Sequence, residues 1–413
     1  MYRMLQVAVI TLVITFITAS SWANSTPQVS NVVAAQRGDD SKLVDIYYDL
    51  ADADGDACTV WAAVKNTAEA DWRIPILSVV GAVGSGISPG TNKHIVWDAG
   101  ADIPGWQGNF KVRVYADDGN SDDSLVLIPG GEFEMGDHYN AGGTDEVPKH
   151  DVYLDAFLMS RYEVTNQQYC TYLNNARSQG QIEVRADNVV YAVGDNDPYL
   201  TTYEGSSYSR ISYNGSVFTI LPDMENHPVV MVSWYGAVAF ANWKSQQQGY
   251  QTCYNLTTWV CDLTKNGFRM PTEAEWEYAA RGGHHNPYYK YPWGSNSISC
   301  SYLNYRNGTI YCNPLGLSAY PYTATVGYYS PNNFGLYDIS GNVWEWCNDW
   351  YASDYYGSSP YTNPPGPTSG SYRVVRGGAW NFSATYCRVA ERSGHAPSHR
   401  YDYNGFRLVL DLE

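Results

Sequence analysis

The chain has 413 residues, enough for two or three domains, and 44% of them are hydrophobic while only 16% are charged, which excludes a wholly disordered protein. Lys and Arg number 25 against 42 Asp and Glu, for a net charge of −17, and a surface of this sign repels nucleic acid. The 37 Tyr, 14 Trp and 37 Gly predict a loop-rich protein with aromatic-lined surfaces and few long helices.

Residues 1–23 have the features of a signal peptide. Arg3 precedes an apolar run from Leu5 to Ala19, and the small residues Ser21 and Ala23 occupy the positions that signal peptidase prefers. We expect cleavage after Ala23, which predicts a secreted protein, periplasmic or at the cell surface, with no membrane span after cleavage. The alternative is a retained membrane anchor, but the run is short and lacks stop-transfer charges.

Export makes the eight cysteines disulfide candidates. The pairs closest in the sequence, Cys253 with Cys261 and Cys300 with Cys312, are the simplest predictions. The chain contains no Cys-x-x-Cys motif, so neither a thioredoxin-like redox site nor a zinc ribbon is expected.

The alternation of short β-rich runs with Gly, Asp and Pro over residues 24–119 predicts a small all-β sandwich of immunoglobulin or fibronectin type. Residues 120–124 are polar and acidic, and are predicted to be a linker. The β-rich runs, separated by Gly, Asp and Pro, are Gln28–Val33, Leu43–Tyr48, Thr59–Val64, Ile76–Val80, His94–Trp97 and Phe110–Tyr115.

Residues 125–413 predict a second domain with two clear helices. Ser233 is an N-cap for a helix over Trp234–Ser245. Thr272 and Glu275 form a capping box for a helix over residues 271–281, which Gly282 and Gly283 end. The remainder is dense in Gly, Tyr, Asn and Pro and predicts short strands and structured loops, so the fold class is α+β.

Seven separated motifs of this second domain occur in the order seen in formylglycine-generating enzymes, and the domain resembles that sulfatase-modifying factor family. The resemblance implies a low-regularity α+β domain of the C-type-lectin-like fold. It also implies an activity, because the authentic enzymes use copper and oxygen to convert a sulfatase cysteine to formylglycine. The motifs are LIPGGEFEMG (127–136), YEVTN (162–166), HPVV (227–230), RMPTEAEWE (269–277), GNVWEW (341–346), RGGAW (376–380) and GFR (405–407).

The copper site of those enzymes is incomplete in this chain. Two cysteines separated by four residues follow their Gly-Gly-Ser motif and bind copper as a thiolate pair, whereas the matching positions here are Phe382 and Cys387, and Ala379 replaces the serine. One thiolate cannot give two-coordinate Cu(I), so copper is not expected. Cys387 stays the candidate catalytic residue of the alternative function, a copper-dependent oxidase. Its other interpretation is a disulfide or a buried small side chain.

Calcium is the better-supported metal. The resemblance assigns Asp338, Gly341, Val343 and Glu345 to one structural calcium site, and hard oxygen ligands of this kind suit Ca²⁺. A second family site would use Asn304 and Tyr305, but Ser318 stands where its aspartate is expected. The alternative for Asp338 and Glu345 is an ordinary turn carboxylate with a salt bridge.

The segment Asn381–Asn404 lies where the family's substrate groove forms. Its polar and aromatic composition is typical of an adaptable contact surface, and it resembles the variable region of proteins diversified by retroelements. We therefore predict a non-catalytic protein that binds an extracellular protein or glycan. A structural cell-envelope module and an ordinary polar loop are the alternatives. The expected contact residues are Phe382, Tyr386, Arg388, His395, His399, Tyr401 and Tyr403.

Overall fold

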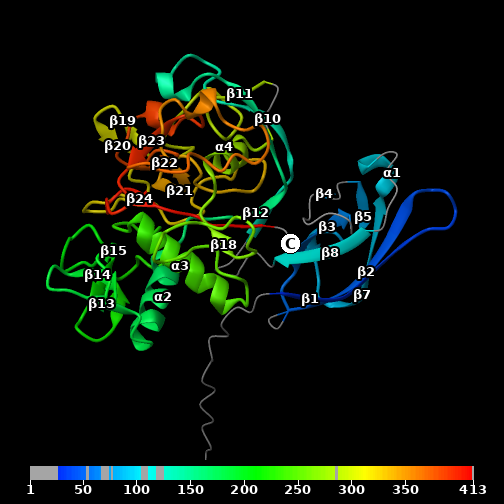
Figure 1. Ribbon diagram of the computed structural model, residues 1–413, viewed down its shortest axis with the longest axis horizontal. Helices are drawn as coiled ribbons and strands as arrows, with labels where there is room; N and C mark the ends of the chain where they lie inside the picture. The colour runs from blue at the N-terminus through cyan, green and yellow to red at the C-terminus, as the bar shows by residue number, and fades with distance from the viewer. Residues whose placement is uncertain are drawn as a thin grey trace, which may run out of the picture.

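The computed structural model describes residues 27–52, 55–66, 74–75, 78–103, 110–117, 125–283 and 287–411. The predicted signal peptide and the predicted linker lie outside the described residues, so both stay predictions. Figure 1 shows a strand-rich unit, coloured blue to cyan, beside a larger unit in which strands and helices are mixed. Of the described helices, none is long and apolar enough to cross a membrane.

The N-terminal unit consists of two sheets that share one hydrophobic core. Its elements are β1 (Gln28–Gln36), β2 (Leu43–Ala51), β3 (Cys58–Asn66), β4 (Ile74–Pro75), β5 (Val79–Gly81), β6 (Gly84–Ile87), β7 (Gly90–Asp98), α1 (Ala99–Asp102) and β8 (Phe110–Asp117). One sheet has the order β1-β2-β7-β5, and in the other β3 lies between β4 and β6 and also pairs with β8. Alternate side chains of β2, such as Ile46 and Tyr48, are buried and meet Val60 and Trp97 in the core. Its likeness to an immunoglobulin or fibronectin domain stays a prediction.

The larger unit contains many short elements, as its Gly- and Tyr-rich sequence predicts. They are β9 (Leu125–Ile128), β10 (Gly131–Met135), η1 (Thr144–Glu146), β11 (His150–Leu154), β12 (Phe157–Ser160), α2 (Asn166–Ser178), β13 (Ile182–Val184), β14 (Val189–Ala192), β15 (Pro198–Thr201), β16 (Ile211–Tyr213), β17 (Phe218–Ile220), α3 (Trp234–Gln247), β18 (Phe268–Arg269), α4 (Glu273–Arg281), β19 (Arg306–Asn307), β20 (Ile310–Tyr311), β21 (Trp344–Trp350), η2 (Tyr355–Gly357), β22 (Arg373–Arg376), η3 (Ala384–Cys387), β23 (Arg392–His395), β24 (Asn404–Gly405) and β25 (Val409–Asp411).

The sheet of order β23-β22-β21-β24 positions the C-terminal segment. Strand β21 pairs with β22 in the antiparallel sense and with β24 in the parallel sense, where Trp344 lies opposite Asn404. A second sheet of order β18-β25-β12-β9 joins the start and the end of this unit. As a result, residues 381–404 leave β22 and return to the edge of β21, beside the buried rings of Trp344 and Trp346.

The two helices that the sequence predicts are present. Ser233 caps α3, and its hydroxyl accepts a hydrogen bond from the amide of Gly236. Thr272 and Glu275 form the predicted capping box of α4. Helix α2 was not predicted, because its sequence is mostly polar, although Thr165 and Gln168 form a capping box there as well.

One disulfide joins cysteines of the described residues, and it is the predicted pair Cys300–Cys312, with the Cα atoms 5.4 Å apart. The predicted pair Cys253–Cys261 is wrong, because both side chains are free thiols. The thiol of Cys253 instead donates to the main-chain carbonyl of Gly267, 3.2 Å away.

Candidate functional site

Cys387 lies at the end of η3 and is completely buried, with 0% of its surface exposed. It packs against Tyr291, Leu303 and Tyr305 in a small hydrophobic cluster. A Cβ atom added to Gly378 would lie 2.8 Å from its Sγ, so the thiol is enclosed on that side too. Burial, and after it the charge of Glu391, raises the pKa of Cys387 far above its usual value. Solvent does not reach this thiol, and its reactive thiolate form is disfavoured.

The position that matches the family's other copper-binding cysteine carries an aromatic ring. The ring of Phe382 packs against those of Trp344, Tyr386 and Tyr403, with centroid distances of 5.5, 5.3 and 5.1 Å. Ala379 is buried and brings no hydroxyl to the site. One enclosed thiol beside a phenyl ring does not fit copper, and no step of a reaction can be routed through a thiolate pair here.

Six of the seven predicted contact residues gather in one place, which we call the C-terminal aromatic surface: Phe382, Tyr386, His395, His399, Tyr401 and Tyr403. Tyr401 and Tyr403 stack at 4.8 Å, with an angle of 12° between their planes. His395 and His399 lie 5.2 and 5.1 Å from the ring of Tyr401. Tyr386 is 42% exposed, whereas Trp344 beneath it is buried. Exposed rings over a buried aromatic base form a firm platform for a ligand.

His395 is held neutral within this surface. Burial, followed by the nearby charge of His399, lowers its pKa to about 4. Its Nδ1 lies 2.8 Å from the Nδ2 of Asn404. Among the described residues, the indole nitrogen of Trp344 and the amide oxygens of Asn381 and Asn404 have no hydrogen-bond partner. These three polar atoms are buried beneath the aromatic rings, so they are unpaired groups of the interior and not of the exposed face.

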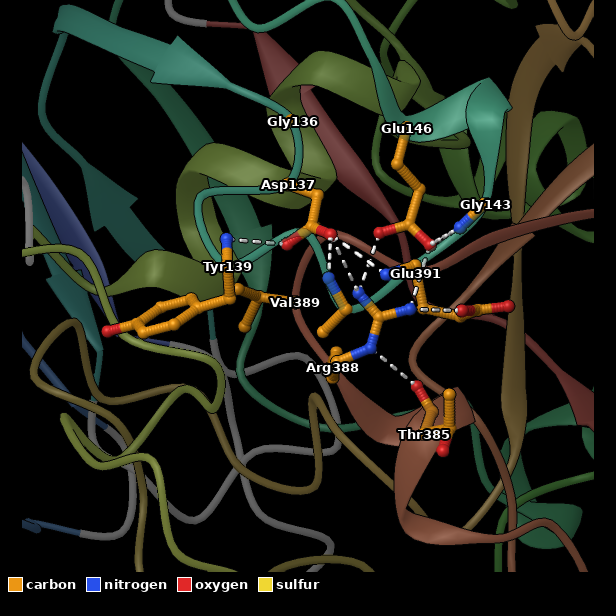
Figure 2. A network of polar contacts seen from close by, with 12 residues as sticks. Gly136, Asp137, Tyr139, Gly143, Glu146, Thr385, Arg388, Val389 and Glu391 are labelled. Carbon is orange, nitrogen blue, oxygen red and sulfur yellow. Dashed lines mark hydrogen bonds and ion pairs between the residues drawn. The ribbon is translucent and has the colours of Figure 1, made fainter.

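Arg388 is the exception, and its assignment as a surface contact is wrong. Figure 2 shows its guanidinium turned inward between acidic side chains. It donates to both carboxylate oxygens of Glu146, at 2.7 and 2.8 Å, and to Glu391 at 2.7 Å. Only 4% of the residue is exposed. A paired and buried arginine holds η1 against the C-terminal segment and does not reach a ligand.

A second aromatic group, which sequence reasoning missed, adjoins this surface. We call Tyr311, Tyr320 and Tyr322 the tyrosine cluster. Their rings lie 5.6, 5.3 and 5.6 Å from the ring of Trp380, and Tyr320 is 39% exposed. The indole nitrogen of Trp380 donates to the carbonyl of Asp402, between Tyr401 and Tyr403. This bond joins the tyrosine cluster to the C-terminal aromatic surface.

The contacts in the structure support some of the predicted calcium ligands and not others. Asp338 is buried, and its Oδ2 accepts a hydrogen bond of 2.6 Å from the amide of Gly327. Its Oδ1 has no partner among the described residues. Burial raises the pKa of Asp338 to about 7, and the charge of Glu345 acts in the same direction. A buried carboxylate oxygen without a partner fits a cation.

Glu345, in contrast, has no free oxygen to offer, so its assignment as a calcium ligand is not supported by its contacts. Both of its oxygens accept from Arg407, at 2.8 and 2.7 Å, and one also accepts from the indole of Trp276. A second carboxylate with a free oxygen, besides Asp338, is Glu163, whose Oε1 is buried and unpartnered among the described residues. Burial, and then repulsion by Asp338 and Glu345, raises the pKa of Glu163.

Asn304, assigned to the second calcium site, belongs to the same network. Its Nδ2 lies 3.4 Å from the Oδ1 of Asn342, and Asn342 donates to Glu163 at 2.7 Å. The Oδ1 of Asn304 is buried without a partner, and Tyr305 packs against Cys387. The structure contains no group of three or more His, Cys, Asp or Glu side chains that could hold a metal, as far as its residues are described. A cation here would therefore also need amide and main-chain oxygens.

Comparisons with known proteins agree with this architecture. The family model of the sulfatase-modifying factor enzyme 1-like domain matches residues 112–412. The chain is 35% identical over 311 residues to a formylglycine-generating enzyme of Thermomonospora curvata, a match that covers 70% of this chain and 93% of the relative. It is 28% identical over 310 residues to inactive C-alpha-formylglycine-generating enzyme 2 of Mus musculus, covering 70% of this chain and 86% of that protein.

Among solved structures, Treponema denticola variable protein 1 matches with a TM-score of 0.50 and 30% identity. The match covers 70% of this chain and 94% of that one. Together with the many short strands and few helices, these matches confirm the predicted α+β, C-type-lectin-like fold class.

Proposed function

Because this chain belongs to the sulfatase-modifying factor family but lacks that family's cysteine pair, we propose that it is a secreted, non-catalytic recognition protein. Its C-terminal aromatic surface binds an extracellular protein or glycan. One contrast carries this proposal: Cys387 is enclosed, whereas Phe382, Tyr386, Tyr401 and Tyr403 gather in a partly exposed cluster. A buried high-pKa thiol is unsuited to catalysis, and partly exposed tyrosines are suited to contact.

The names of two similar proteins support this proposal. One relative is called an inactive formylglycine-generating enzyme, and one structural neighbour is called a variable protein. We propose that residues 381–404 are the segment that varies in this chain, since they connect β22 to β24 and form the exposed surface. A structural role in the cell envelope is the remaining non-catalytic alternative.

Binding is tested with arrays of purified cell-surface proteins and of oligosaccharides. We expect the triple variant Phe382→Ala, Tyr401→Ala, Tyr403→Ala to lose the signals that the unaltered chain gives. The matched control is the double variant Tyr361→Ala, Tyr372→Ala, which removes two exposed tyrosines that lie outside the surface. Equal signals from the triple variant and the control would refute this role of the surface.

Catalysis is tested separately with a Cys-x-Pro-x-Arg peptide, copper and oxygen, followed by mass spectrometry. We expect no formylglycine. Formylglycine that forms with the unaltered chain and disappears in Cys387→Ala would overturn the proposal and establish the oxidase instead.

We also propose that calcium stabilises the fold. Three buried and unpartnered oxygens support it, namely Asp338 Oδ1, Glu163 Oε1 and Asn304 Oδ1; the main-chain carbonyls of Gly341 and Val343 would complete the site by family resemblance. Calcium should raise the melting temperature of the unaltered chain and not that of Asp338→Asn. Asp349→Asn, which alters another buried carboxyl, should keep the calcium response. If calcium stabilises Asp338→Asn as much as the unaltered chain, calcium does not bind to this network.

A further inference from the structure

Arg306 lies between the tyrosine cluster and the C-terminal aromatic surface. It is the first residue of β19, and its main-chain amide donates to the carbonyl of Phe382 at 2.9 Å. The same residue forms an isolated parallel bridge with Ser383. Across the hairpin it pairs directly with Tyr311. Residues directly opposite on neighbouring antiparallel strands share a face of the sheet, so Arg306 is on the face that carries the ring of Tyr311.

The guanidinium of Arg306 has no internal partner. Within the part of the chain that the structure describes, no side chain or carbonyl accepts from it, and its Nε is buried without a hydrogen bond. Other arginines of this region are paired: Arg388 with Glu146 and Glu391, and Arg392 with Glu273. Asp402, between Tyr401 and Tyr403, does not pair with Arg306 either.

Carboxylates are in excess, with 42 acidic and 25 basic residues, yet none of those in the described structure pairs with Arg306. Arg400, which also lacks a carboxylate, donates instead to Thr201 and to the carbonyl of Ser398. The buried Nε of Arg306, without an acceptor, costs free energy. The two terminal nitrogens are not among the buried unpaired atoms, so they can donate to water or to a ligand. A carboxylate matches the planar fork of a guanidinium with two parallel hydrogen bonds.

We propose that Arg306 binds the carboxylate of an acidic sugar, such as a uronic or sialic acid, in a glycan that lies across the tyrosine cluster and the C-terminal aromatic surface. This inference rests on the proposed recognition function and names its ligand class. The tyrosine rings stack on neighbouring sugar rings.

The charge of the molecule favours a glycan over an acidic peptide. A peptide rich in Asp and Glu would bring several negative charges to a chain of net charge −17, and this surface offers it one unpaired arginine. A glycan with one carboxylate needs one cation. Its uncharged rings suit the exposed tyrosines of the flanking groups, Tyr320 and Tyr386.

The test uses the full chain and three sets of probes: oligosaccharides that contain a sialic or uronic acid, the same oligosaccharides with that carboxylate removed or reduced, and acidic peptides. We expect the acidic oligosaccharides to bind about ten- to hundredfold more tightly than their neutral counterparts, the range set by hydrogen bonds to a charged group. Arg306→Gln should remove this difference, and Arg306→Lys should restore only part of it, because an ammonium lacks the planar fork. Arg177→Gln is the matched control, since it removes the same charge from α2, and should bind like the unaltered chain.

Four outcomes would overturn the inference. Equal binding of acidic and neutral oligosaccharides would show that Arg306 does not read the carboxylate. Binding of the acidic peptides in an Arg306-dependent manner would identify a protein ligand, and the recognition function would stand. If Arg306→Gln binds normally while the triple variant of the aromatic surface does not, the inference fails and the proposed function survives. If none of the glycan or protein probes depends on either set of residues, both fail.

Discussion

Two arginines of the same region differ in what surrounds them. Arg388 occurs in the contact segment and is charged, features that make an arginine a typical contact residue, yet it is enclosed by Glu146 and Glu391. Arg306 lies outside that segment and has no partner in the described structure. Residue type and position along the chain do not distinguish a structural arginine from a binding one. The arrangement of acidic side chains around each guanidinium does.

The first prediction concerns Arg388→Met. Removing one partner of a buried ion pair leaves an uncompensated charge, and we expect a loss of about 3–5 kcal/mol in the free energy of unfolding, measured by urea denaturation. The affinity of the molecules that remain folded should not change, because Arg388 does not reach the C-terminal aromatic surface. If Arg388→Met keeps its stability and loses binding, Arg388 is a contact residue and not a structural one.

At the scale of elements, local patterns predict the helices, whereas long-range pairing brings the residues of the site together. Ser233 and the Thr272–Glu275 box marked α3 and α4 correctly, because capping depends on residues three positions apart. The approach of β19 to Phe382 and Ser383 depends on a bridge between residues 77 positions apart, Arg306 and Ser383, for which no local pattern exists. Local composition was enough to propose the contact segment, which stays a prediction, whereas it gave no indication of Arg306 or the tyrosine cluster. The free oxygen of Glu163 could not be predicted either, because its neighbours Asp338 and Asn342 belong to motifs far away in the sequence.

The contact between η1 and the segment that carries Glu391 predicts a pH dependence. Burial, and then repulsion by Glu146, raises the pKa of Glu391 from its usual 4.5 to about 8. The folded state thus holds this proton more tightly than the unfolded chain does, so the contribution of Glu391 to stability is complete below about pH 4.5 and is lost as the pH rises through about 8. Glu391→Gln should remove this contribution to the fall, as followed by thermal melting between pH 5 and 9. If the melting temperature of the variant falls with pH as steeply as that of the unaltered chain, other groups cause the fall.

At the scale of the whole molecule, an aromatic pair connects the two units. Trp61 of β3 and Tyr115 of β8 stack at 5.7 Å, and both pack against the large core that contains α2 and α3. We expect Trp61→Ala to lower the stability of the N-terminal unit and to separate its unfolding from that of the larger unit in calorimetry, because contacts between units couple their unfolding. Tyr47→Ala, which removes an exposed ring stacked on His94, should leave the transitions as they are. Unchanged transitions in Trp61→Ala would exclude this coupling.

The net charge and Arg306 should act on an acidic glycan in opposite ways, and salt separates the two. The charge of −17 repels the ligand at long range, and salt screens this repulsion because the Debye length falls from about 30 Å at 0.01 M to about 10 Å at 0.1 M. Association should then become several-fold faster as salt rises. Salt also weakens the contact of the carboxylate with Arg306, so dissociation should accelerate as well. In Arg306→Gln the salt dependence of association should persist while that of dissociation disappears, as surface plasmon resonance can measure. Association that slows with salt would mean that the local field of Arg306 outweighs the charge of the whole chain.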